Sequence, residues 1–145
     1  MSEHADPRQL VVFTLGAEQY ALPIQQVHEI IRYTEPRSVA SRADWVRGVI
    51  SLRGRIVPVY NLAARLGVAS ELSEHAKIVI VEAESETAGV IVDGVEEVLT
   101  VAEAQVEEVP GGDTTLIDSI AKIGDRLVVL LKPSTIFSAG EALAA

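Results

Sequence analysis

The chain has 145 residues, of which 48% are hydrophobic but only 4% aromatic, so a domain of this length must build its core from aliphatic side chains. The formal net charge of −9 argues against nucleic acid and anionic membrane surfaces as partners, because both attract proteins through basic patches. The absence of cysteine excludes disulfides, thiolate metal sites and thiol catalysis.

The N-terminal segment Met1–Pro7 is polar and acidic, without the basic and apolar regions of a signal peptide. No apolar run reaches the length of a membrane span. We therefore expect a cytoplasmic protein in which residues 1–8 are a disordered lead-in and 9–145 form one domain.

The first third of the chain predicts a hairpin, a third strand and a short helix. Runs rich in β-branched residues predict the strands, and the turn at Gly16–Gln19 joins the first two. Ser41 as N-cap, with Asp44 three residues later, predicts the helix. The predicted strands are Leu10–Leu15, Tyr20–Ile24 and Val27–Tyr33, and the predicted helix is Ser41–Val46.

A central hairpin follows in Val46–Leu62, with its turn at Arg53-Gly54-Arg55. Glycine suits this turn because it accepts positive φ at little cost. Two arginines at a hairpin tip are explained by simple solvation, or by contact with a carboxylate of a partner, for which arginine is a preferred donor. After the hairpin, Asn61 as N-cap and Gly67 as terminator predict a short helix.

The second half repeats this order after a polar connection at residues 68–76. An ambiguous amphipathic segment covers Ala102–Val109, and Pro133–Ala142 is predicted as a C-terminal helix that begins at a proline. The predicted strands are Lys77–Ala83, Ala88–Val92, Val95–Val101, Leu116–Ile123 and Arg126–Leu131.

An internal repeat relates the two halves. Val11–Ile31 aligns without a gap on Val79–Leu99, and the turn at Gly54 parallels the one at Gly124 with one residue of slippage. We infer a mainly β protein of two similar small β-barrels packed on each other, with a repeat boundary near 68–76. A groove between two such halves is a natural partner site.

Catalytic patterns are missing from the sequence. His4, His28 and His75 stand far apart, without the spacing of metal ligands. The adjacent carboxylates Glu96 and Glu97 would point to opposite faces of a strand, so they form no acid–base dyad. There is no phosphate loop and no nucleophile elbow. We expect no enzyme activity, no metal and no cofactor.

Three ordered blocks resemble the CheW family of bacterial chemotaxis coupling proteins. They are Phe13–Ile30, Arg47–Val59 and Gly89–Val95, and the resemblance extends from about Gln9 to the C-terminal helix. It implies two SH3-like five-stranded β-barrels packed on a shared core, with short helices including one at the C-terminus, and it implies a non-catalytic scaffold. Such a scaffold bridges the cytoplasmic tips of methyl-accepting chemoreceptors to the regulatory domain of the histidine kinase CheA, at membrane-associated receptor arrays. The resemblance also allows contacts between copies of the chain in array rings.

The resemblance assigns roles to single residues. It implies receptor binding by Arg53, Glu29, Val27 and Val98, and kinase binding at Gly48. One departure lies beside this arginine, since Ser51 stands where the family usually has asparagine, and the geometry of the turn can differ as a result.

Two other functions stay open at this point. The same fold could serve as an adaptor in a type IV pilus, gliding or developmental pathway, which the sequence does not separate from chemotaxis. A barrel that binds a small molecule, or an enzyme, would instead need a polar pocket with converging titratable groups.

Overall fold

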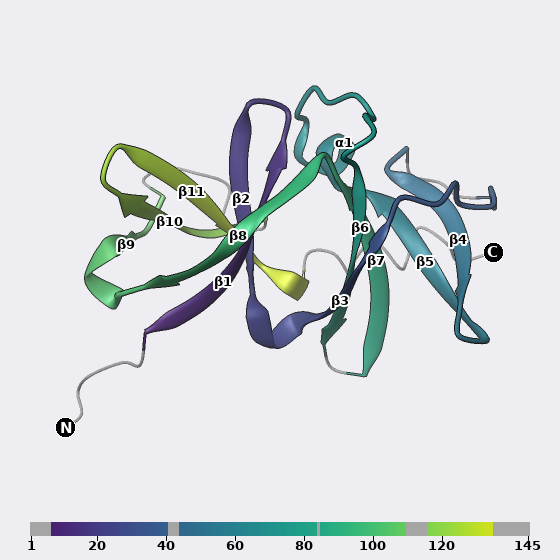
Figure 1. Cartoon of the computed structure of the whole chain (residues 1–145), viewed down its shortest axis with the longest axis horizontal. Coiled ribbons are helices and arrows are strands. Elements are labelled where there is room, and N and C mark those ends of the chain that lie inside the picture. The colour runs from purple at the N-terminus through teal and green to yellow at the C-terminus, as the bar shows by residue number, and fades with distance from the viewer. Residues whose placement is uncertain (1–6, 41–43, 84, 110–115, 135–145) are drawn as a thin grey trace.

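The computed structural model describes residues 7–40, 44–83, 85–109 and 116–134 (Figure 1). Within these residues the fold is almost entirely β, with the five-residue helix α1 (Leu62–Leu66), a helical start at Pro133 and Ser134, and two short 3₁₀ turns, η1 (Ile24–Gln26) and η2 (Glu103–Gln105). The strands are β1 (Arg8–Leu15), β2 (Glu18–Pro23), β3 (Val27–Arg32), β4 (Val46–Leu52), β5 (Arg55–Asn61), β6 (Lys77–Ala83), β7 (Glu86–Val92), β8 (Gly94–Val101), β9 (Val106–Glu107), β10 (Ile117–Ile123) and β11 (Arg126–Leu131).

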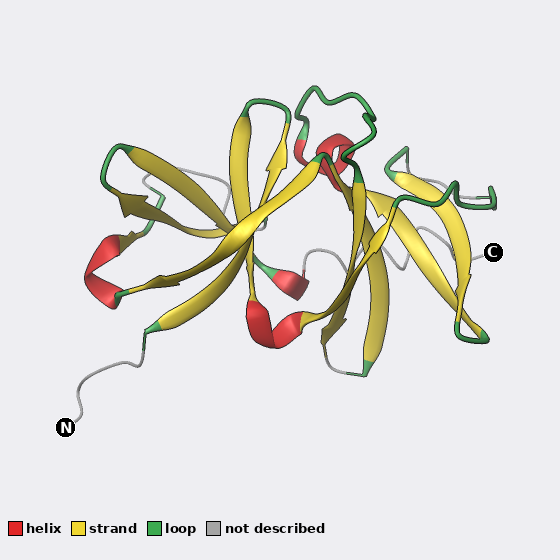
Figure 2. Ribbon diagram, in the orientation of Figure 1, coloured by secondary structure: helices red, strands yellow, loops and turns green. Residues whose placement is uncertain are grey.

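The strands form two sheets, which confirms the mainly β prediction (Figure 2). One sheet has the order β8-β1-β2-β11-β10-β9, and the other has the order β3-β6-β7-β5-β4. Hairpins β10–β11 and β4–β5 lie at opposite ends of the molecule, with hairpins β1–β2 and β6–β7 between them (Figure 1). We call the first sheet barrel A and the second barrel B.

Each barrel takes strands from both halves of the sequence. Hairpin β1–β2 lies between β8 and β11, and hairpin β6–β7 lies between β3 and β5. The pairings β2–β11 and β5–β7 are parallel, whereas the other pairings are antiparallel. The boundary near 68–76 separates the two sequence repeats, but it does not separate the two sheets. The first hairpin of each repeat is part of the sheet whose other strands come from the other repeat.

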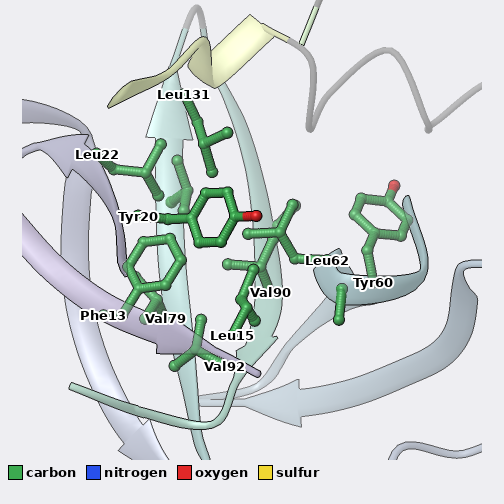
Figure 3. Close-up of a cluster of buried hydrophobic side chains, with 13 residues drawn as sticks. Phe13, Leu15, Tyr20, Leu22, Tyr60, Leu62, Val79, Val90, Val92 and Leu131 are labelled. Carbon is green, nitrogen blue, oxygen red and sulfur yellow. The ribbon is translucent and has the colours of Figure 1, made fainter. Parts of the chain in front are cut away.

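Aliphatic side chains fill both barrels and the space between them. Barrel A is filled around Leu10 and Val12, and barrel B around Ile78 and Ile80, which are the repeat equivalents of these residues. A third and larger cluster joins the barrels, with Phe13 stacked on Tyr20 at a ring-centroid distance of 6.4 Å (Figure 3). Since burial of apolar surface is the main driving force for folding, this shared cluster holds the two barrels together.

The local predictions are confirmed where short-range chemistry decides them. Asn61 caps α1 by accepting a hydrogen bond from the Ala64 amide at 3.1 Å, and Gly67 ends the helix at φ 75°. The predicted helix Ser41–Val46 is wrong over its described part, because Asp44 and Trp45 form a turn and Val46 begins β4. The Trp45 carbonyl accepts a hydrogen bond from the Asn61 amide at 2.6 Å, so this segment continues the β4–β5 ladder.

Predictions at the two ends of the chain fall partly outside the described residues. Strand β1 already begins at Arg8, within the segment predicted as a lead-in, while residues 1–6 are not described. The C-terminal helix predicted for Pro133–Ala142 lies outside the described residues from position 135 onward.

Candidate interaction surface

The turn between β4 and β5 carries an arginine in a strained backbone conformation. Arg53 has φ 51° and Gly54 has φ 81°, the two positive values of a type I′ hairpin turn. The pairings Leu52–Arg55 and Ile123–Arg126 make Gly124, at φ 62°, the barrel A counterpart of Arg53. A left-handed conformation costs a residue other than glycine about 1–2 kcal/mol. Such strain at an exposed residue suggests that its side chain has a function.

Glu29 of β3 holds the Arg53 side chain. Arg53 Nη1 donates to Glu29 Oε1 at 2.6 Å and to Glu29 Oε2 at 2.7 Å. The Arg53 side chain is 69% exposed, whereas that of Glu29 is only 20% exposed. An ion pair this open to water contributes little to stability. Its main effect is to fix the direction of a guanidinium group that still faces solvent.

A second ion pair occupies the related place in barrel A. Glu97 of β8, the repeat equivalent of Glu29, accepts a hydrogen bond from Arg126 Nη2 at 2.7 Å. Arg126 also donates from Nε and Nη2 to Gln19 Oε1, at 3.2 and 3.0 Å. Arg126 is the first residue of β11, and its side chain is hydrogen-bonded to β2 and β8. Arg53, in contrast, lies in the turn at the tip of its hairpin. The repeat therefore accounts for an ion pair in each barrel but not for an arginine at a hairpin tip.

The predicted valine contacts lie in two different environments. Val27 is half-buried and packs against the shared core, as does its repeat equivalent Val95. Val98 on β8 is 54% exposed, and its equivalent Ile30 on β3 is 40% exposed. Val27 lies on β3, two residues before Glu29, whereas Val98 lies on β8 in the other sheet. Packing alone explains the valine at position 27, but it does not explain the exposed valine at 98.

Gly48 is required by a close approach of two backbones. Its φ is 143°, and a Cβ atom at this position would lie 2.0 Å from the Arg37 carbonyl oxygen. Arg37 and Val49 exchange two backbone hydrogen bonds of 2.8 and 2.9 Å beside it. Any side chain at 48 would push the segment around Arg37 away from β4. The glycine therefore shapes this edge of barrel B.

Tyr33 and Arg47 restrain Glu35 at the same edge. The Tyr33 hydroxyl donates to Glu35 Oε1 at 3.1 Å, and Arg47 Nη2 lies 3.6 Å from Glu35 Oε2. Burial raises the pKa of Tyr33, and the bond to Glu35 raises it further, so the hydroxyl keeps its proton at neutral pH.

Within the described ranges, no three histidine, aspartate or glutamate side chains gather where they could hold a metal ion. In the same residues, no helix has the length and apolar character needed to cross a bilayer.

The fold defines a class of protein with two β-barrels that contain strands from both sequence repeats and share one aliphatic core. In this chain an exposed arginine lies at the tip of one hairpin. The model of the CheW-like domain matches residues 9–141, and the chain belongs to this family.

Individual relatives agree with this assignment. The chain is 30% identical to the chemotaxis protein CheW of Klebsiella aerogenes, over 92% of its own length and 84% of that protein. The crystal structure of the scaffolding protein TtCheW from Thermoanaerobacter tengcongensis superposes with a TM-score of 0.82 at 34% identity, covering 91% of this chain and 88% of that one. A more partial match, 34% identical over 57% of this chain and 47% of the relative, is protein PilI of Pseudomonas aeruginosa.

Proposed function

We propose that this protein is a non-catalytic scaffold that couples the cytoplasmic tips of chemoreceptors to the histidine kinase CheA. Its place of action is the cytoplasm, at membrane-associated receptor arrays. The observation that carries the proposal is Arg53, which occupies a strained position at an exposed hairpin tip and is aimed by Glu29. The family match over residues 9–141 and the relatives named for chemotaxis support it.

In this proposal the receptor contacts Arg53 directly. A guanidinium group gives charge-assisted hydrogen bonds to a carboxylate, and only Nη1 of Arg53 is engaged by Glu29 among the described residues. Glu29 then acts as a positioning residue, because it holds Arg53 while being largely covered itself. Val27 supports β3 from the core side, and Val98 supplies an apolar contact.

The kinase contact is assigned to the region shaped by Gly48. Because Gly48 permits the approach of Arg37 to β4, a change at 48 would alter the backbone around this edge rather than delete a contacting side chain. The regulatory domain of CheA, whose fold is similar, would pair with the barrel end.

Reconstitution tests the proposal. The purified chain is mixed with a receptor cytoplasmic fragment and CheA from the same organism, and kinase autophosphorylation is measured with and without the chain. We expect receptor control of the kinase only when the chain is present. Failure to bind either partner in a pull-down would contradict the proposal.

A second candidate is a CheW-like adaptor of a pathway other than flagellar chemotaxis, such as a type IV pilus, gliding or developmental system. The match to PilI, a relative that is not named for chemotaxis, favours keeping it. Neighbouring genes separate the two candidates, and so does the receptor whose tip is bound most tightly.

A further inference from the structure

The edge of β4 next to the hairpin tip carries backbone groups that point away from their own sheet. Among the described residues, β4 is the last strand of barrel B and has β5 as its one strand partner, besides the bridge between Val49 and Arg37. Alternate residues of an antiparallel strand direct their N–H and C=O groups to opposite sides. Val49 directs its groups to Arg37, so Ser51, two residues later, directs its groups to the same outer side. No backbone partner for Ser51 occurs on that side among the described residues.

Barrel A covers the equivalent edge more fully. Strand β10, the counterpart of β4, is followed in the sheet by β9, with Ile120 paired to Glu107 and Ala121 to Val106. In barrel B, the described residues keep the first of these pairings alone, as the bridge between Arg37 and Val49. The next position, opposite Ile50, would be Pro36, which has no N–H to continue a ladder.

The two edges also differ in their protection. Lys122 of β10 stands at the position of Ser51, and its Nζ lies 3.3 Å from Glu107 Oε2 of the covering strand β9. Barrel B has the small Ser51 there instead. Within the part of the chain that the structure describes, the edge of β4 beside Ser51 therefore has neither a covering strand nor a lysine.

A hollow of about 410 Å³ lies along this edge, between β4 and the end of β3. Its apolar lining includes Ile31 and Leu52, which pack against the core of barrel B. Its charged lining consists of Arg32, Arg37 and Glu35, and Glu35 is already engaged by Tyr33 and Arg47. The hollow is therefore basic on a chain whose formal net charge is −9.

We infer that the edge of β4 at Ser51 accepts an extended acidic segment of a partner protein as an added β-strand. The partner backbone bonds to the N–H and C=O of Ser51, one apolar side chain packs against Ile31 and Leu52, and a carboxylate meets Arg32 or Arg37. This binding mode is independent of the receptor contact at Arg53, because it uses backbone groups and a different pair of arginines.

The test uses the full isotope-labelled chain and a short capped peptide in which glutamate and valine alternate. We expect amide chemical-shift changes centred on Ile50, Ser51 and Arg37, and none with a peptide in which lysine replaces glutamate. Ser51→Pro removes the outward N–H without touching the ladder to β5, so it should weaken binding up to about tenfold, the effect of losing one hydrogen bond. Ser51→Ala and Lys122→Pro should bind like the wild type.

Several results would overturn the inference. These are no saturable shift at any accessible peptide concentration, shifts centred on β10, or equal binding by Ser51→Pro. Shifts at Ser51 that depend on protein concentration without peptide would assign the edge to a second copy of the chain instead. If Ser51→Pro does not fold, peptides with N-methyl groups at alternate positions decide the matter, because only one of the two alternating sets should lose binding.

Discussion

Replacing Gly48 by alanine tests the packing at the edge of barrel B. The added Cβ would lie 2.0 Å from the Arg37 carbonyl oxygen and 2.6 Å from its carbon, so the backbone itself must move. A side chain forced to keep φ near 143° adds about 1–3 kcal/mol of strain. Loss of the two bonds between Arg37 and Val49 adds about 1–3 kcal/mol, at about 0.5–1.5 kcal/mol each. The expected destabilisation of Gly48→Ala is therefore about 2–6 kcal/mol.

The assay is urea unfolding followed by circular dichroism, with Gly54→Ala as the matched control. Gly54 also has a positive φ, of 81°, but no atom lies within 4 Å of the position of its Cβ. Its substitution should therefore cost only the backbone strain, about 1 kcal/mol. Equal losses in the two variants, or a loss below about 1 kcal/mol for Gly48→Ala, would refute the steric argument.

Three further predictions concern α1, the buried tyrosines and Val98. Asn61→Ala removes the cap of α1 and should lower the free energy of unfolding by about 1 kcal/mol, whereas Asn61→Asp should keep most of it, as urea unfolding can measure. Burial raises the pKa of Tyr20 and Tyr60 above the usual value, so the fold favours their protonated forms. Their contribution is fully present below pH of about 10 and is lost as pH rises through the raised values. The alkaline unfolding midpoint should therefore move upward when both tyrosines become phenylalanine, and an unchanged midpoint would contradict this reasoning. Val98→Glu should weaken receptor binding with a change in stability below about 0.5 kcal/mol, because the side chain is 54% exposed, and unchanged binding by calorimetry would remove Val98 from the surface.

Local chemistry made most strands and α1 predictable from the sequence. The span Lys77–Ala83 was predicted as the structure has it, since an uninterrupted aliphatic run bounded by polar turns allows little else. Asn61 and Gly67 defined the ends of α1 for the same reason, because cap and terminator act within a few residues.

Long-range pairing was not predictable in this way. The sequence showed a repeat, but the exchange of hairpins between the repeats depends on β5 pairing with β7 and β2 pairing with β11, for which no local pattern exists. The helix predicted at Ser41–Val46 was wrong over its described part. The capping pattern is a local signal, whereas the Trp45 carbonyl forms a long-range hydrogen bond with the Asn61 amide that extends the β4–β5 pairing.

The candidate site shows the same division. The resemblance named Arg53 and Glu29 as two single residues, whereas the structure shows a hydrogen bond between the β4–β5 turn and β3 that links them. Nothing in the sequence signalled the strain at Arg53, although the contrast with Gly124 was available from the repeat. The assignments of Val27, Val98 and Gly48 to particular partners stay predictions.

The most direct measurement is the affinity of Arg53→Glu for a receptor fragment and for CheA, by calorimetry, beside Arg55→Glu from the same hairpin. Because the exposed pair with Glu29 contributes little to stability, both variants should stay folded. Loss of a charge-assisted contact should weaken receptor binding by Arg53→Glu at least about tenfold, with kinase binding nearly unchanged and Arg55→Glu close to wild type on both. Equal loss for both partners, or equal loss in the two variants, would contradict the assignment of Arg53 to the receptor.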